Sequence, residues 1–221
     1  MALLDCYTPF MMIPLESLGT FVLASAVLAL VPGPDNLFVL MQSAMHGRKA
    51  GLLITLGLCS GLIVHTSAVA LGVAVIFQTS VVAFSLLKMA GALYLAYLAW
   101  QAFQASATTL DGSDTNPYTN AALYRRGILM NITNPKVTIF FLAFLPQFAS
   151  PEYGAISPQI FLLGGVFMST ALLVFSAIAI LAGTLGVWLQ RSPTTQMYLN
   201  RGAGMVFIGL ALKLATTSQT L

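Results

Sequence analysis

Two short polar stretches that interrupt long apolar runs carry the residues best suited to bind a small ion. The first stretch contains Pro32, Gly33, Pro34, Asp35 and Asn36. The second contains Asn131, Asn134, Pro135 and Lys136. Backbone inside a bilayer must satisfy its hydrogen bonds internally, so interrupted helices persist there only where they line protein or a wet cavity. Paired interruptions in two halves of a chain indicate the substrate site of a transporter.

The composition requires a membrane as solvent for this chain of 221 residues. It is 58% hydrophobic and 7% charged, whereas soluble domains carry about 25% charged residues. The net charge of +3 lacks the basic stripe with interleaved aromatics that nucleic-acid binding needs. Cys6 and Cys59 have neither the spacing of a metal site nor that of a redox pair. We therefore expect no nucleic acid, metal or cofactor.

Six segments are long and apolar enough to span a bilayer, which takes roughly 20 residues. They cover about residues 18–44, 50–77, 81–104, 127–148, 158–189 and 197–216. A polar linker, residues 105–123, divides the chain into two units of three spans, about 18–104 and 124–216, within one transmembrane domain. Arg48, Lys49, Arg125, Arg126 and Arg191 fall on one side of this model, which predicts that their loops face the cytoplasm.

The two units resemble one another. Residues 88–96 of the third span match residues 201–209 of the sixth, pairing Gly91 with Gly204 and Tyr94 with Phe207. The two interruptions also occupy the same ordinal place, in spans one and four. Because three spans per unit is an odd number, the units must lie in opposite orientations. The sequence thus predicts an all-α fold of six helices in two inverted repeats, with the first and fourth helices interrupted.

The order and spacing of the motifs resemble the LysE/RhtB family of bacterial amino-acid exporters. The matching motifs are residues 32–36, 46–51, 87–95, 131–136 and 144–148, within a similarity that covers about residues 18–216. This resemblance implies export of an amino acid across the bacterial inner membrane by a multi-pass antiporter driven by the proton gradient. Residues 59–62 and 137–141, where exporters of basic amino acids tend to carry carboxylates, hold no acid. The chain therefore looks like the branch for homoserine, threonine and other neutral amino acids such as leucine.

Given such a substrate, the interruptions predict how its charges are bound. Asn or Asp caps a helix whose first residue is proline, so we expect Asn134 to cap the helix from Pro135, and Asp35 or Asn36 to cap the helix after Pro34. The exposed N–H groups of such ends attract anions and would bind the α-carboxylate. Backbone carbonyls freed before Pro32 and Pro135 would accept hydrogen bonds from the ammonium group.

Three ionisable residues have open alternatives. Asp35 either pairs with the ammonium group or carries the coupling proton, or it is only a helix cap. His65, midway along an uncharged span, is either a proton relay or a neutral side chain hydrogen-bonded between helices. Lys136 either holds the carboxylate or extends toward the cytoplasmic face. Asn131 is more an interhelical hydrogen-bonder than a ligand.

Two other kinds of membrane protein are alternatives to an exporter. An intramembrane hydrolase is disfavoured, because Ser60 and His65 point about 140° apart on one helix and no nucleophile elbow or H-E-x-x-H sequence occurs. We expect no enzyme activity. A passive channel or a structural membrane subunit remains the alternative. A homodimer is compatible with the many glycines, which allow close helix packing.

Overall fold

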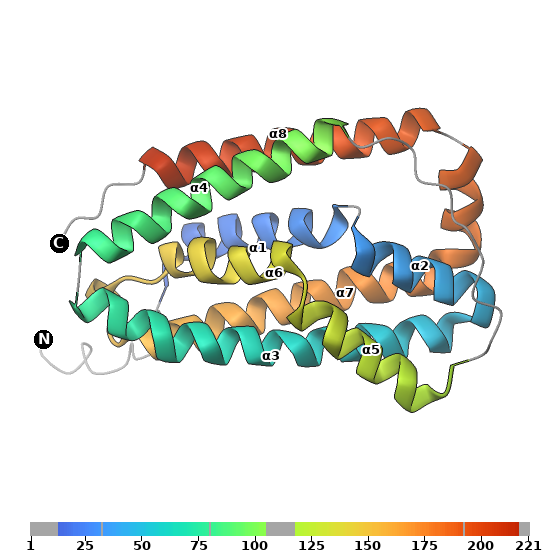
Figure 1. Cartoon of the computed structure of the whole chain (residues 1–221), viewed down its shortest axis with the longest axis horizontal. Coiled ribbons are helices and arrows are strands. Elements are labelled where there is room, and N and C mark those ends of the chain that lie inside the picture. Colours follow the sequence, from blue (N-terminus) through green and yellow to red (C-terminus); the bar gives the residue numbers. More distant parts are fainter. Residues whose placement is uncertain (1–12, 32, 80, 105–117, 192, 217–221) are drawn as a thin grey trace, which may run out of the picture.

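The computed structural model describes residues 13–31, 33–79, 81–104, 118–191 and 193–216, and no strand occurs among them. The helices run roughly parallel to one long axis (Figure 1). The shapes of the first and fourth predicted spans differ from those of the others, because each is a pair of helices joined at a bend.

Both interruptions bend their segments strongly. Helix α1 (Leu15–Leu30) meets α2 (Pro34–His46) at 60°. Helix α5 (Asn120–Ile132) meets the segment that begins with α6 (Pro135–Ile139) at 50°, and this segment continues as a π-helical turn η1 (Phe140–Phe144) and a 3₁₀ turn η2 (Leu145–Phe148). Proline at the first position of α2 and α6 explains both restarts, since it has no N–H to give and its φ suits a helix start.

The other helices are continuous. They are α3 (Arg48–Thr79), α4 (Val81–Gln104), α7 (Ile156–Arg191) and α8 (Pro193–Thr216), with a short 3₁₀ turn η3 (Pro151–Tyr153) before α7. Among the described residues, α3 and α7 are long and apolar enough to cross a membrane, and the two bent pairs raise this number to four if each is one span. The six-span arrangement, with α4 and α8 as further spans, stays a prediction.

The helices form three groups. Helices α4 and α8 pack against each other on one side, and α3 and α7 pack against each other on the other side. Helices α1 and α6 lie between these pairs, whereas α5 crosses α3 (Figure 1). Helix α3 also packs along α5, and α7 packs along both α1 and α2. The interruptions are therefore flanked by helices, while Pro34 and Pro135 themselves remain exposed.

Backbones approach closely where α3 crosses α5. A Cβ atom added to Gly57 would lie 2.2 Å from the carbonyl oxygen of Tyr124, and one added to Gly127 would lie 2.4 Å from that of Ile54. Only glycine permits this approach, which fixes how α5 delivers Asn131 to the centre. A Cβ on Gly61 of α3 would in turn meet the Asn131 side chain at 2.7 Å.

The helix that contains the fourth predicted span starts seven residues before the predicted start of that span, residue 127. Helix α5 begins at Asn120, because the Thr119 side chain caps it by accepting a hydrogen bond from the N–H of Ala122. Residues 105–117 of the predicted linker lie outside the described residues, and residues 120–123 are helical. As a consequence the second interruption lies near the middle of its segment, as the first one does.

The α2–α3 turn at Gly47, the start of α5 and the end of α7 lie at the same end of the molecule (Figure 1). Arg126 links two of these elements there. Its guanidinium lies 4.7 Å from the ring centre of Phe38 on α2 and 5.3 Å from that of Tyr118, and it donates a hydrogen bond of 2.7 Å to the Tyr118 hydroxyl. Helices α2 and α5 are thus tied together beyond the interruptions.

Candidate functional site

The two interruptions meet in the middle of the fold. Nδ2 of Asn134 donates a hydrogen bond of 2.7 Å to Oδ2 of Asp35, and both side chains are buried. A Cβ atom added to Gly33 would lie only 3.3 Å from Nζ of Lys136. The first and second interruptions, which are about 100 residues apart in the chain, therefore share one polar centre.

The restart after the second interruption follows the predicted pattern. Helix α6 begins at Pro135, and Oδ1 of Asn134 accepts a hydrogen bond of 2.9 Å from the N–H of Lys136. The expected cap by Asn134 is confirmed. Because its Nδ2 binds Asp35 at the same time, Asn134 both starts α6 and orients the carboxylate of the other interruption.

The expected cap at the first interruption is wrong. The residue before α2 is Gly33, which has no side chain to cap with. Asp35 lies in the first turn of α2 and turns its carboxylate to Asn134 instead. Asn36 reaches back along the chain, and its Nδ2 donates a hydrogen bond of 2.6 Å to the carbonyl oxygen of Ala29. The acidic side chain is thus directed toward the other interruption rather than used locally.

Backbone carbonyls left without a helical partner are satisfied by side chains. Proline at position 32 offers no N–H to the carbonyl of Leu28, and Val31 follows the last residue of α1. Nζ of Lys136 donates to both of these carbonyls, at 3.2 and 3.3 Å. The two expected roles of Lys136 stay predictions, and the carbonyls expected to bind an ammonium group at the first interruption already hold the one of Lys136.

The second interruption is completed by His65 in the same manner. Pro135 has no N–H to give to the carbonyl of Asn131. That oxygen accepts a hydrogen bond of 3.1 Å from the N–H of Asn134 and another of 3.1 Å from Nε2 of His65. The imidazole also lies against Phe141, with the ring centres 5.7 Å apart. The structure therefore places His65 as an interhelical hydrogen-bonder beside the centre, and its predicted part in proton transfer stays untested.

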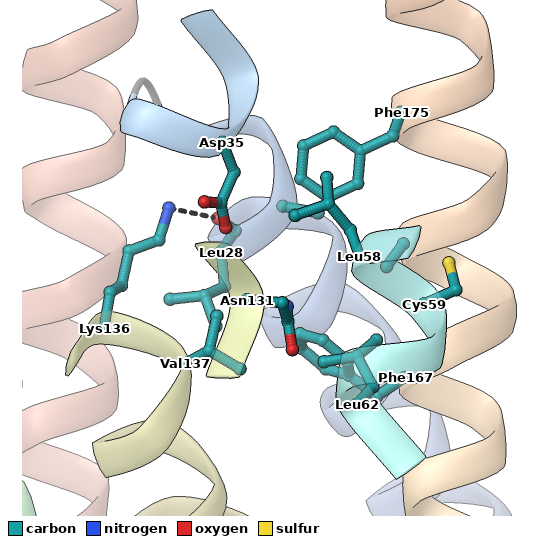
Figure 2. A pocket seen from close by; sticks show the side chains of 12 residues that line it. Leu28, Asp35, Leu58, Cys59, Leu62, Asn131, Lys136, Val137, Phe167 and Phe175 are labelled. Atoms are coloured by element: carbon teal, nitrogen blue, oxygen red, sulfur yellow. Dashed lines mark hydrogen bonds between the residues drawn. The ribbon is translucent and has the colours of Figure 1, made fainter. Parts of the chain in front are cut away.

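A small cavity lies between the interruptions and the α3–α7 pair. Its volume is 20 Å³, and its lining includes Asp35, Asn131, Lys136, Cys59 and Phe167. Figure 2 shows Asp35 and Lys136 extending from the two interruptions toward the same space, with Asn131 beside them. A cavity of this size holds about one water molecule. An amino acid therefore does not fit here unless side chains move.

A much larger cavity lies on the other side of the interruptions, against α4 and α8. Its volume is 540 Å³, and Gly33, Pro34, Asn134, Pro135 and Lys136 line it from the interruptions. Its other lining residues include Tyr94, Gln101 and Asn200, which sequence reasoning did not select as site residues. Pro34 and Pro135 thus face one shared space, while Pro32 lies outside the described residues.

An aromatic cluster packs beside the small cavity, between α1, η1 and α7. Its members are Phe21, Phe140, Phe141, Phe144, Phe148 and Phe167, with neighbouring ring centres 4.8–6.3 Å apart. Phe21, Phe140 and Phe141 are at most 1% exposed. Since Phe167 lines the small cavity as well, the polar centre is closed by packed rings on this side.

Several buried polar atoms at and below the centre have no hydrogen-bond partner. Among the described residues, five of the six such atoms belong to α2, namely Asp35 Oδ1, Asn36 Oδ1, Gln42 Nε2, Ser43 Oγ and His46 Nδ1, and the sixth is Asn131 Oδ1. Buried polar atoms without partners usually indicate a bound water or ligand. Gln42 lies seven residues after Asp35, which is two helical turns along the same face. This spacing could have identified Gln42 as a candidate site residue from the sequence.

Comparison with known proteins gives consistent results over most of the chain. The family model of the LysE type translocator matches residues 26–218. The homoserine/homoserine lactone efflux protein of Salmonella typhi is 30% identical over 196 residues, which is 89% of this chain and 94% of that protein. The leucine efflux protein of Klebsiella pneumoniae is 30% identical over 203 residues, covering 89% and 93%. No solved structure matches.

Proposed function

The chain belongs to the LysE family of translocators, and from this premise we propose that it exports a neutral amino acid across the bacterial inner membrane in exchange for protons. One observation carries the proposal, namely the hydrogen bond between Asn134 and Asp35 that joins the two interruptions into one polar centre. Relatives that are named as efflux proteins for homoserine, its lactone and leucine support a small neutral substrate.

The substrate binds between the interruptions, in contact with Gly33, Pro34, Asp35, Asn36, Asn131, Asn134, Pro135 and Lys136, with Pro32 adjoining them. Its ammonium group lies near the Asp35 carboxylate, and its carboxylate lies near the positive end of α6, which begins at Pro135. The rest of the small cavity is lined by Leu58, Leu62, Val137, Phe167 and Phe175. This apolar lining holds no acid to pair with a basic side chain, which favours a neutral substrate.

Entry and exit require the centre to open alternately to two sides. The 540 Å³ cavity reaches the interruptions from the α4–α8 side, whereas packed phenylalanines close the centre on the α1–η1 side. We therefore propose that the substrate enters through the large cavity. We also propose that this side faces the cytoplasm, because basic residues such as Arg48, Lys49 and Arg126 favour a cytoplasmic position. Release on the far side needs movement of the aromatic cluster.

The two inverted repeats fit this cycle. Helix α3 of the first repeat packs along α5 of the second, and α7 of the second packs along α2 of the first. The interruptions are equivalent as well, with proline first and a charged residue second in each restarted helix: Asp35 in α2 and Lys136 in α6. Rocking of one repeat against the other would open either side in turn. A homodimer stays a prediction.

Asp35 is our proposed proton carrier, because it is a carboxylate that is 3% exposed and lines the small cavity. The relay role of His65 is separable from its structural one. In His65→Gln the amide Nε2 can still donate to the Asn131 carbonyl, so the structural role predicts proton-driven transport within about twofold of wild type. Loss of pH-driven transport in this variant, with its thermal stability retained, would instead assign the relay to His65.

A passive membrane channel or a structural subunit is the alternative. Inside-out vesicles containing the protein separate these functions. With an imposed proton gradient, we expect uptake of radiolabelled homoserine, threonine or leucine above its external concentration, no uptake of lysine, and collapse of the accumulated pool on adding a protonophore. Equilibration without accumulation would favour the channel, because a pore cannot move its substrate uphill.

A further inference from the structure

We infer that the carbonyl oxygens of Leu28 and Val31 form the ammonium subsite of this transporter, and that the ammonium group of Lys136 occupies this subsite whenever no amino acid is bound. The inference rests on the proposed function, since it assumes that an amino acid binds between the interruptions. It gives Lys136 the role of a built-in competitor of the substrate.

The geometry of the occupied subsite is that of an ammonium site. Lys136 Nζ donates to the carbonyls of Leu28 and Val31 at 3.2 and 3.3 Å. The carboxylate of Asp35 lines the same small cavity as Lys136. An ammonium group has three donors and one positive charge, so two carbonyls and one nearby carboxylate match it well.

The α-ammonium group of an amino acid offers the same set of donors and the same charge. The carbonyls of Leu28 and Val31 would therefore accept it in place of Lys136. Both carbonyls lie at the end of α1, next to the first interruption, whereas Lys136 comes from the second. The ammonium of Lys136 thus closes a contact between the two repeats that a free amino acid would break.

The cavities give the displaced side chain a place to go. Among the described residues, Lys136 alone lines both the 20 Å³ cavity and the 540 Å³ cavity. The small cavity has room for about one water, so a substrate cannot enter it while the lysine side chain remains. Movement of Lys136 into the large cavity frees both the carbonyls and the space beside Asp35.

This arrangement makes substrate binding the event that releases α1 from α6. In the protein without substrate, the hydrogen bonds from Lys136 hold these two helices together. The substrate's ammonium group replaces Lys136 at the two carbonyls but does not connect them to α6. A substrate that lacks the ammonium group cannot displace Lys136. In the rival role, Lys136 binds the substrate's carboxylate, and removal of the lysine side chain would weaken the binding of an amino acid instead of strengthening it.

The test uses ligands that carry the ammonium group but no carboxylate. The amino alcohols that correspond to leucine and threonine are titrated into purified wild type, Lys136→Met and the exposed control Lys49→Met, by calorimetry. We expect at least about tenfold tighter binding to Lys136→Met than to the other two, because a tethered competitor acts at an effective concentration in the millimolar range or above. Equal or weaker binding to Lys136→Met would overturn the inference.

A second measurement needs no substitution at the site and covers the case in which Lys136→Met does not fold. Wild-type protein is prepared with ¹³C-labelled lysine, and the NMR signal of each lysine ε-carbon is followed while the amino alcohol is added. At saturation we expect the Lys136 signal to move toward that of the exposed Lys49, whose own signal stays in place. An unmoved Lys136 signal would contradict the inference. Failure of uphill amino-acid uptake by the wild type would contradict the proposed function instead.

Discussion

Asp35→Asn is expected to abolish proton-driven export while the protein still folds. The amide oxygen of asparagine can accept the hydrogen bond that Asn134 gives to Asp35 at 2.7 Å, so the contact between the interruptions persists. The variant cannot carry a proton and leaves Lys136 without its nearby negative charge. Because no other acid lies among the described residues that line the two cavities, we expect gradient-driven uptake in inside-out vesicles to fall to the background of vesicles without the protein.

Glu16→Gln is the matched control for this experiment. Glu16 is also an acid in the first turn of a helix that leads to the first interruption, but it is exposed. Its replacement is expected to leave accumulation unchanged. Exchange of labelled for unlabelled amino acid without a gradient should survive in Asp35→Asn if only coupling is lost. Full pH-driven accumulation by Asp35→Asn would remove Asp35 as the proton carrier.

Gly57→Ala is expected to have the largest effect on stability. The added methyl group would lie 2.2 Å from the carbonyl oxygen of Tyr124 and 3.0 Å from Cα of Gly127. Both neighbours are backbone atoms, so no side chain can turn away, and α5 must move as a whole. Overpacking costs about 1–3 kcal/mol and occasionally more, and here we expect the upper end or beyond, seen as a strongly lowered melting temperature in detergent.

Gly72→Ala provides the comparison on the same helix. Nothing lies within 4 Å of a Cβ added to Gly72, so the only change is a better helix former. That change stabilises an exposed helix position by up to about 1 kcal/mol. We expect Gly72→Ala to melt at or slightly above the wild-type temperature. Similar melting temperatures for the two variants would show that α3 and α5 do not cross as closely as described.

Proline and hydropathy were sufficient to predict where the helices are interrupted. Both restarts begin with proline, at Pro34 and Pro135, and the cap by Asn134 follows from its position before Pro135. Proline also identifies the carbonyls that lose their helical donor, since it lacks an N–H. These are local rules, and the sequence contains everything they need.

The side chains that replace the missing donors could not be predicted in this way. Lys136 reaches Leu28 across 108 residues and His65 reaches Asn131 across 66, and such pairs depend on how the helices pack. The cap expected after Pro34 was wrong for a different reason. Helix α2 begins at Pro34 itself, so its cap position falls on Gly33, and Asp35 lies inside the first turn.

The start of α5 was missed for a different reason. Hydropathy places the span after Arg125 and Arg126, because charged residues end an apolar run. The helix extends seven residues further toward the linker, where Thr119 caps it. Arg126 is accommodated at this level by the rings of Phe38 and Tyr118. The capping signal was present in the sequence, but a window that counts apolar residues does not detect it.

The claim that the two interruptions meet in the membrane can be measured directly by joining them. Cysteines are placed at Asp35 and Asn134 in a chain whose native Cys6 and Cys59 are replaced by alanine, and vesicles are treated with a short bifunctional thiol reagent. We predict an intramolecular cross-link in the double variant only, with single-cysteine variants as controls for labelling. If both single cysteines react but the double variant forms no cross-link, the interruptions lie apart and the shared site does not exist.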